Sequence, residues 1–296
     1  MPKLFFSKGL IIPLAASITI IGSSNANAQD VRYSGLQTNA HQQQYAAAYI
    51  PPQQQRFDAP AYNAAPKKSD WNFAAGAGVI YSPTYEGSDN YRIIPIPAIS
   101  ADYKDGLFFA NVWDGVGSYP IQGQNYKLGG AIGLDLGRDE SDDRKNLRGM
   151  GDIDMSPTAN LMGEYGFGSL KLSGKVTTGN DEYGTTATAK LGTMHPVSNE
   201  LVLLASAGTT WADEEHMESR FGVSPGQAAL SGYGAYQAES GIKSVGLTVG
   251  AVYAATPKID VQFMAKADQL LGDAADSPLT KSEFQPSAIL TTSYKF

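Results

Sequence analysis

The chain ends on a segment in which polarity alternates from one residue to the next. In an extended strand from Pro286 to Phe296, successive side chains point to opposite faces. One face carries Ala288, Leu290, Thr292, Tyr294 and Phe296, and the other carries Ser287, Thr291, Ser293 and Lys295, with Ile289 as the exception. The apolar face finishes on two aromatic residues, which is typical of the closing strand of a membrane-spanning β-barrel with an aromatic girdle. A soluble sandwich strand that ends in Phe is the alternative.

The first 28 residues have the features of an export signal. A short basic start with Lys3 and Lys8 precedes an apolar run over 9–22, and Ala26-Asn27-Ala28 has the small-x-small form of a leader-peptidase site. We therefore expect residues 1–28 to be a cleaved signal peptide. The apolar run is too short to remain as a spanning helix, which needs about 20 residues.

The composition restricts how the exported chain can cross a membrane. It contains no Cys, so disulfides cannot hold it together as they hold many small secreted domains. No apolar run of about 20 residues follows the signal, which leaves a closed β-barrel in the lipid of the bacterial outer membrane. Because the signal carries two Lys and no acid, 20 of the 22 basic residues remain against 29 acidic ones, a net charge of −9. A nucleic-acid partner is not expected for so acidic an export product.

Residues 29–70 differ in composition from everything that follows. They include eight Gln and four Pro and show no helical or strand period. We predict a disordered Gln/Pro-rich periplasmic tail. The alternative is a tether that touches peptidoglycan or a partner protein, anchored by aromatic residues: Tyr33, Tyr45, Tyr49, Phe57 and Tyr62.

Residues 71–296 form a series of roughly ten-residue stretches of alternating polarity separated by Gly, Asp, Asn and Pro. Leu170, Leu172 and Val176, for example, alternate with Lys171, Ser173 and Lys175. Many positions on the polar face are Gly, Ala, Ser or Thr, and such small residues suit a crowded lumen better than a water-facing sandwich. The fold class predicted is therefore all-β, a transmembrane antiparallel up-and-down β-barrel of about 12 strands.

The predicted strands cover residues 71–81, 92–103, 107–122 with a kink near Gly115, 125–136, 157–165, 169–178, 184–195, 200–211, 228–239, 242–253, 258–269 and 285–296. Aromatic residues at strand ends supply the expected girdles: Trp71, Tyr81, Tyr103, Trp113, Tyr126, Tyr165, Trp211, Tyr253 and Tyr294. An even strand number places both ends of the barrel chain on the periplasmic side.

The predicted connections conflict with that arrangement in one respect. Those after the first and eleventh predicted strands point outward, whereas the long ones after the fourth and eighth point into the periplasm, where turns are usually short. A misassigned strand, a barrel of ten or fourteen strands, or long periplasmic loops would each explain the conflict.

Four short motifs in the long connections carry a family resemblance. They are Tyr85-Glu86-Gly87-Ser88-Asp89, Gly151-Asp152-Ile153-Asp154, Phe221-Gly222-Val223-Ser224 and Asp276-Ser277-Pro278. In this order, and over about 71–296, they resemble the MipA/OmpV family of outer-membrane proteins. The resemblance implies a scaffold that links a murein hydrolase, a lytic transglycosylase, to a bifunctional penicillin-binding protein. It also leaves open an adhesin or envelope-stress role, and it implies no catalytic residue.

Several acidic groups have both a functional and a structural interpretation. Asp152 and Asp154 share a strand face, where paired carboxylates perform acid/base chemistry or hold a hard cation, but they equally cap a turn and pair with Arg138, Arg144 or Arg148. Asp273, Asp276 and Ser277 offer oxygen ligands for Ca²⁺, and so do Glu86, Ser88 and Asp89. Neither spacing matches a known calcium loop, so we favour carboxylates that bond to backbone. No metal or cofactor is expected.

Catalysis has a single local candidate. His216 lies in an acidic stretch with Asp213, near Ser224 and Ser231, and a hydrolase needs Ser, His and an acid to converge. No Gly-x-Ser-x-Gly motif supports it, so we predict that the protein is not an enzyme. Lipid hydrolysis by a barrel enzyme and a narrow channel for small solutes remain as alternatives to the scaffold.

The candidate interaction residues all lie in the long connections: Tyr85, Glu86, Asp89, Arg144, Lys145, Arg148, Asp152, Asp154, Phe221, Asp273 and Asp276. Mixed charge around Arg144, Lys145 and Arg148 suits a weak, salt-sensitive protein contact if this loop is periplasmic. Replacing the three with Ser would then weaken partner capture. Tyr294 and Phe296 resemble the C-terminal signal that outer-membrane proteins present to their insertion machinery.

Overall fold

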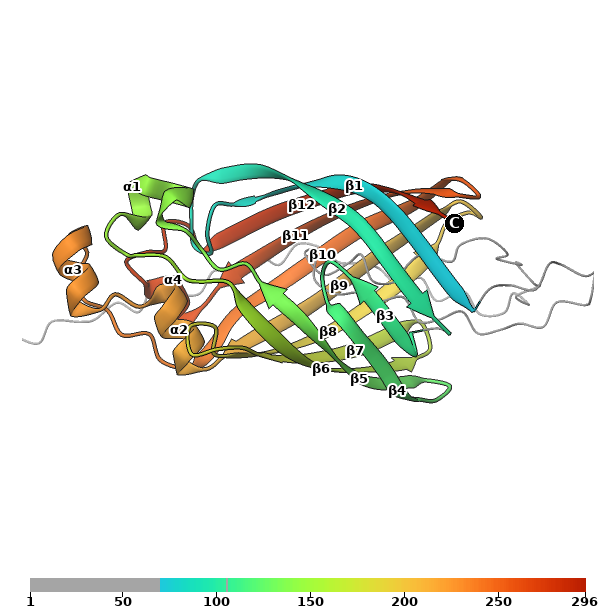
Figure 1. Ribbon diagram of the computed structural model, residues 1–296, viewed down its shortest axis with the longest axis horizontal. Helices are drawn as coiled ribbons and strands as arrows, with labels where there is room; N and C mark the ends of the chain where they lie inside the picture. Colours follow the sequence, from blue (N-terminus) through green and yellow to red (C-terminus); the bar gives the residue numbers. More distant parts are fainter. Residues whose placement is uncertain (1–69, 105) are drawn as a thin grey trace, which may run out of the picture. The chain divides into compact units, whose positions relative to one another are not determined.

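The structure is a computed structural model that describes residues 70–104 and 106–296, so the predicted signal peptide and all but the last residue of the predicted tail lie outside it. The described chain forms a closed antiparallel barrel in which each strand pairs with its sequence neighbours and β1 closes on β12 (Figure 1). The twelve strands are β1 Trp71–Pro83, β2 Tyr91–Tyr103, β3 Phe108–Asn111, β4 Gly115–Gln122, β5 Tyr126–Asp135, β6 Ser156–Phe167, β7 Leu170–Thr178, β8 Thr185–Pro196, β9 Leu201–Ala212, β10 Gly241–Thr256, β11 Ile259–Leu270 and β12 Phe284–Lys295. The predicted fold class is confirmed.

The closing strand has the two faces that its sequence predicts. Leu290 and Tyr294 of β12 are exposed on the outer surface, whereas Thr291 and Ser293 are buried inside the barrel. Ile289, the exception in the alternation, points inward and is buried against apolar side chains of other strands. Exposed Leu, Val, Ile and Phe side chains cover the outer face of the other strands as well, which is the surface that lipid contacts.

Short helices occur only in the connections between described strands. They are the 3₁₀ helix η1 Glu140–Asp143 and the α-helices α1 Arg144–Leu147, α2 Glu214–Phe221, α3 Pro225–Ser231 and α4 Gly272–Asp276. None of the helices in the described ranges has the length and apolar character needed to span a membrane.

The single kinked strand predicted over residues 107–122 is wrong, because the chain reverses there. The side-chain oxygen of Asn111 accepts the backbone N–H groups of Trp113 and Asp114 at 2.8 and 2.7 Å, which closes a turn. Gly115 then takes a positive φ of 81° and starts β4. Two strands, β3 and β4, therefore replace the one predicted.

The strand predicted over residues 228–239 is also wrong. Ser224 caps α3 by accepting the N–H of Gln227, whose side chain accepts the Ser224 N–H in return. Pro225 occupies the first turn, and Gly232 ends the helix in the left-handed conformation. Because these residues cap both ends of a helix, residues 225–231 form α3 although the polarity of the following residues alternates as in a strand. The strand lost here offsets the strand gained at Gly115, so the total of twelve is unchanged.

All four long connections lie at one end of the barrel, which we call the lid end. They comprise residues 84–90, 136–155, 213–240 and 271–283, after β1, β5, β9 and β11. The opposite end, the turn end, has five short turns between its strands, and β1 starts and β12 finishes there (Figure 1). The sequence pattern predicted that the long connections after β5 and β9 lie at the opposite end from those after β1 and β11, and this is wrong. The prediction treated β3 and β4 as one strand, which reversed the predicted direction of each strand from β5 to β9.

Most of the aromatic residues predicted for the girdles lie on the outer surface. Trp71, Tyr126, Tyr165, Tyr253 and Tyr294 are exposed towards the turn end, and Tyr81 and Trp211 towards the lid end. Trp113 is the exception, since it lies in the β3–β4 turn and packs inside the barrel.

The lumen is not lined by small polar residues alone. One buried apolar cluster joins Ile80, Leu204, Val252, Met264 and Ile289, and a second joins Phe109, Tyr119, Ala131 and Met162. Both clusters consist of inward-facing side chains, so packed apolar groups fill part of the barrel interior.

Candidate functional site

The four long connections interlock to form a lid over one end of the lumen. One apolar cluster of the lid contains Tyr85, Leu147, Met150, Val223 and Leu279, and so draws on all four connections. A second cluster packs α2 and α4 against the ends of β9 and β11: Ala212, Met217, Phe221, Ala238, Leu270 and Ala274. Buried apolar contact between segments that are far apart in sequence gives the lid its own core.

A buried carboxylate joins the first two connections. Asp143 accepts hydrogen bonds from the hydroxyl of Ser88 at 3.1 Å and from the amides of Asn90 and Asn146 at 2.9 and 3.0 Å. Burial alone would raise the pKa of Asp143, but these donors outweigh it and lower the pKa below its ordinary value. The Asp143 charge therefore holds residues 84–90 against α1.

The motifs that carry the family resemblance supply further joints of the lid. The Tyr85 hydroxyl donates to the carbonyl of Leu279 at 2.9 Å, and the Ser277 hydroxyl donates to the carbonyl of Phe221 at 2.6 Å. Ile153 forms a two-way backbone bridge with Arg138. These motifs thus act by closing the lid.

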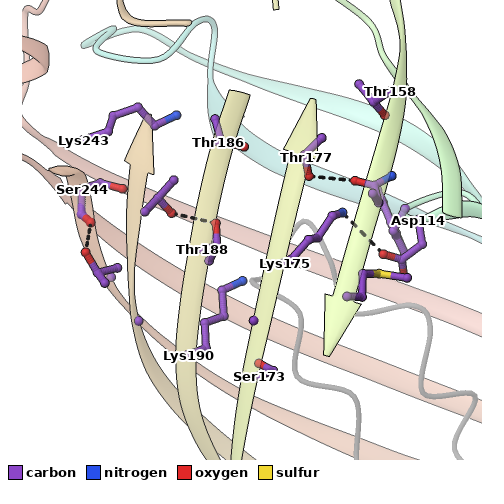
Figure 2. A pocket seen from close by; sticks show the side chains of 18 of the residues that line it. Asp114, Thr158, Ser173, Lys175, Thr177, Thr186, Thr188, Lys190, Lys243 and Ser244 are labelled. Atoms are coloured by element: carbon purple, nitrogen blue, oxygen red, sulfur yellow. Dashed lines mark hydrogen bonds and ion pairs between the residues drawn. The ribbon is translucent and has the colours of Figure 1, made fainter. Parts of the chain in front are cut away.

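Below the lid, the lumen contains a polar cavity of about 390 Å³. Its walls come mainly from β5–β11, and Figure 2 shows Lys175, Lys190 and Lys243 among the hydroxyl side chains that line it. Three groups of the lid border it as well, namely Glu86, His216 and Arg220.

The cavity ends where the inward face of the wall becomes apolar. Along β8 the inward residues Thr186, Thr188 and Lys190 are followed, after Gly192, by Met194, which packs on the apolar cluster around Met264. On β9 and β10 the polar lining likewise gives way to Leu204 and Val252. The lid is therefore the roof of the cavity and this cluster is its floor.

Ten charged side chains line the cavity, and the two signs are equal in number. The acidic residues are Glu86, Asp114, Asp135, Glu164 and Asp268, and the basic residues are Lys175, Lys190, Arg220, Lys243 and Lys266. Ion pairs join Lys266 to Asp268 at 2.5 Å, Arg220 to Asp135 at 2.6 Å and Lys243 to Glu86 at 2.9 Å, with a longer one from Lys175 to Asp114 at 3.5 Å.

A bulge in β10 brings Lys243 to the cavity. The β9–β10 register passes from Ile242 to Ser244 while its partner advances by one residue, so Lys243 is the extra residue. Both Lys243 and Ser244 consequently face the lumen, where a regular strand would place them on opposite faces.

The hydrogen bonds of His216 determine its tautomer. Its Nδ1 lies 2.8 Å from the carbonyl oxygen of Tyr183, which can only accept, so Nδ1 carries the proton. Nε2 is then the acceptor for the Lys243 ammonium, 3.1 Å away, and the same ammonium donates to Glu86 at 3.0 Å. A neutral imidazole, a cation and a carboxylate thus form one chain across the boundary of lid and barrel.

The pKa values of this chain agree with those charges. Burial lowers the pKa of His216 to about 3, and the neighbouring Lys243 cation adds to the lowering. Burial would raise the pKa of Glu86, but the Lys243 cation outweighs it and brings the pKa to about 2. At neutral pH the imidazole is therefore neutral and the Glu86 carboxylate is ionised.

The candidate interaction residues divide into buried and exposed groups. Tyr85 and Phe221 belong to the core of the lid, and Glu86 is paired with Lys243. Arg144, Lys145 and Arg148 are exposed on and beside α1 at the lid end. Asp89 is exposed and lies near the Asn146 amide at 3.5 Å. The structure therefore does not bring these residues together in one surface patch.

The remaining acidic candidates bond mainly to backbone. Asp152 accepts the N–H of Glu140 at 2.6 Å, and Asp273 accepts the N–H of Glu239 at 2.7 Å. Asp154 and Asp276 are exposed. Within the described ranges, no group of three or more His, Asp or Glu side chains is arranged to hold a metal ion.

The catalytic candidate does not assemble. Asp213 accepts the backbone N–H of His216 at 2.9 Å, while both ring nitrogens are occupied by Tyr183 and Lys243. The Ser224 hydroxyl caps α3. The serine and the acid thus have structural roles in helix capping.

Sequence reasoning did not identify the charged residues of the cavity as a site. Lys175, Lys266 and Asp268 do fall on the polar face of the alternating pattern, which was the available signal. Lys190 falls on the same polar face, after Thr186 and Thr188, but its lack of a carboxylate partner depends on pairing across strands. Lys243 gave no signal, because it reaches the lumen only through the β10 bulge.

Similarity to known proteins is clearest at the level of the family. A family model described as MltA-interacting protein MipA matches residues 75–296. No curated protein matches the chain. Among solved structures, the outer-membrane expressed OmpT of Vibrio cholerae is 9% identical over 77% of this chain and 97% of that chain, with a TM-score of 0.36. An outer membrane channel from Pseudomonas putida F1 is 13% identical over 81% of this chain and 99% of that chain, with a TM-score of 0.41. The NanC porin is 7% identical over 76% of this chain and 100% of that chain, with a TM-score of 0.39.

Proposed function

The chain belongs to the MipA family, whose members are described as MltA-interacting proteins, and from this premise we propose that it is a non-enzymatic scaffold of the bacterial outer membrane. It binds a murein hydrolase, a lytic transglycosylase of the MltA kind, and brings it to a penicillin-binding protein. The barrel anchors the complex in the membrane, and the contact is made on the periplasmic side.

The observation that carries this proposal is the closed lid. Side chains from all four long connections share one apolar cluster above the lumen, and a second apolar cluster lies across the lumen below the cavity. A barrel filled in this way has no wide water-filled pore through its described residues, so contact with a partner protein is expected on its outer surfaces.

We propose that the lytic transglycosylase contacts the turn end of the barrel. Outer-membrane barrels have short periplasmic turns and longer extracellular loops, so the turn end faces the periplasm and the lid end faces outward. Residues 29–69 join the barrel at β1, whose first residue lies at the turn end. We therefore propose that the Gln-rich segment contributes to the contact with a periplasmic partner.

Capture of a purified MltA-type lytic transglycosylase by the detergent-solubilised protein tests the proposal. We expect binding by the full mature chain and at least a tenfold loss on deleting residues 29–69, measured by biolayer interferometry at low salt. The matched control replaces Arg144, Lys145 and Arg148 with Ser. Because these residues lie at the lid end, this variant should bind like the parent protein. Absence of capture by the full mature chain would refute the scaffold.

A narrow channel for small solutes is the second candidate, and the polar cavity favours it. Conductance of the purified protein in planar bilayers separates the two functions. The scaffold predicts a barrel that stays closed, whereas steady single-channel steps at neutral pH would favour the channel.

A further inference from the structure

We propose that the lumen cavity is a binding site for a small hydroxylated monocarboxylate, with Lys190 as the cation that receives the carboxylate. This inference concerns the barrel interior and does not depend on the scaffold function, which uses the outer surface of the turn end.

Lys190 differs from the other cavity lysines in lacking a carboxylate partner. Lys175, Lys243 and Lys266 each form an ion pair, whereas no described carboxylate lies within ion-pair distance of Lys190. Its side chain is half-buried on β8 and lines the cavity (Figure 2). An ammonium that lines an enclosed cavity and has no carboxylate partner attracts an anionic ligand, because a charge-assisted hydrogen bond to it is strong.

The wall is shaped to hold the Lys190 side chain. On the neighbouring strand β9, the residue opposite Lys190 is Gly208. A Cβ at Gly208 would lie 2.5 Å from Cγ of Lys190, so the absence of a side chain there makes room for the lysine stem. The glycine thus leaves room for the Lys190 stem to lie along the lumen wall while its ammonium lines the cavity.

The charges that face Lys190 indicate a monoanion. They are Lys175 with Asp114 on one side and Lys266 with Asp268 on the other. The fifth acid of the lining, Glu164, is paired with Lys171, which does not line the cavity. Lys190 is therefore the cation of the lining that remains for the ligand to neutralise. A dianion would overcompensate this charge.

The size and lining of the cavity indicate an organic ligand that carries hydroxyl groups. A volume of about 390 Å³ is within the range of about 300–1,000 Å³ for small-molecule sites, and it exceeds what a bare halide would fill. The hydroxyls of Thr188, Ser206 and Thr248 line the wall around Lys190. Hydroxyl groups both donate and accept, so they match the hydroxyls of a sugar acid.

Equilibrium dialysis of the full mature protein in detergent against radiolabelled gluconate tests this site. Gluconate is a hydroxylated monocarboxylate, and sorbitol, a neutral polyol of the same length, is the comparison ligand. We expect gluconate to bind with about one equivalent per barrel. Sorbitol should bind at least tenfold more weakly, because it lacks the carboxylate that forms a charge-assisted hydrogen bond with the Lys190 ammonium. A parallel sample is refolded in gluconate, so that binding does not require passage through the lid.

Two variants of equal charge change assign the binding to Lys190. K190M removes the ammonium while it keeps an unbranched apolar stem, and because it breaks no ion pair of the described residues it should fold, as checked by the heat-dependent gel shift of barrels. It should lower gluconate affinity at least tenfold. K258M removes an exposed lysine from the β10–β11 turn and should bind like the parent. The proposal is overturned if neither parent preparation binds gluconate, if sorbitol binds equally well, or if K190M binds like the parent.

Discussion

Single residues determine how the lid is held to the barrel. Lys243 donates to Glu86 on one side and to Nε2 of His216 on the other, and His216 donates from Nδ1 to the Tyr183 carbonyl. The chain is consistent only when the imidazole is neutral, because a protonated Nε2 would direct a second cation at the Lys243 ammonium 3.1 Å away. Arg220, which also borders the cavity, adds to this repulsion. Protonation of His216 therefore opposes closure of the lid.

Acidification should accordingly loosen the lid. The pKa of His216 is about 3 in the closed lid and about 6.5 when the residue is exposed. Between these two pH values only the open lid binds the proton. The free energy that favours the closed lid therefore decreases as the pH falls below about 6.5. Loss of the Glu86 charge adds to this only from about pH 4.5 downward. Amide hydrogen exchange in α2, corrected for intrinsic rates, should show an opening constant roughly tenfold larger at pH 5 than at pH 7. An H216Q variant, which cannot titrate there, should lose this dependence; a dependence unchanged in H216Q would contradict the assignment.

At the scale of elements, the β3–β4 turn decides the direction of the strands that follow. Its last residue, Gly115, has a φ of 81°, and a Cβ there would overlap the carbonyl oxygen of Ile132 on β5. A G115A substitution should therefore destabilise the barrel by about 1–3 kcal/mol from the backbone conformation alone, with the overlap adding to it. The urea midpoint of the detergent-folded protein measures this. Gly174 in β7 is the matched control, since a Cβ there meets only the Thr188 oxygen at 3.9 Å. Equal midpoints for G115A and G174A would show that the turn tolerates a side chain.

The same turn shows where prediction from sequence stops. A period of two in polarity predicts strands well, because one face meets lipid and the other faces the lumen. It does not detect a reversal within an apolar stretch, and the turn after Asn111 depends on one side chain capping two N–H groups. The alternating pattern also predicted a strand over residues 228–239, but the capping box at Ser224 begins the helix α3 there instead. Neither the β10 bulge at Lys243 nor the joints of the lid follow any local period, so the site itself could not be predicted.

At the scale of the whole barrel, the separation of β3 and β4 into two strands brings all four long connections to one end. The predicted conflict over loop length then disappears, because all four long connections share one end and the proposed orientation, with the turn end in the periplasm, agrees with the usual rule of short periplasmic turns. With the proposed sidedness, Arg144, Lys145 and Arg148 belong to the end that faces outward. In that orientation, the surface proposed for a periplasmic partner consists of the five short turns and the segment before β1.

This sidedness gives a prediction for intact cells. Because the chain contains no Cys, single cysteines report position without background labelling. K145C, exposed on α1, should react in whole cells with a polyethylene-glycol maleimide that is too large for porins. N199C, exposed in the β8–β9 turn, should react only after the outer membrane is permeabilised. Equal labelling of both variants in permeabilised cells is the control for reactivity. The reverse pattern in whole cells would place the lid end in the periplasm and return Arg144, Lys145 and Arg148 to the candidate surface for a murein hydrolase.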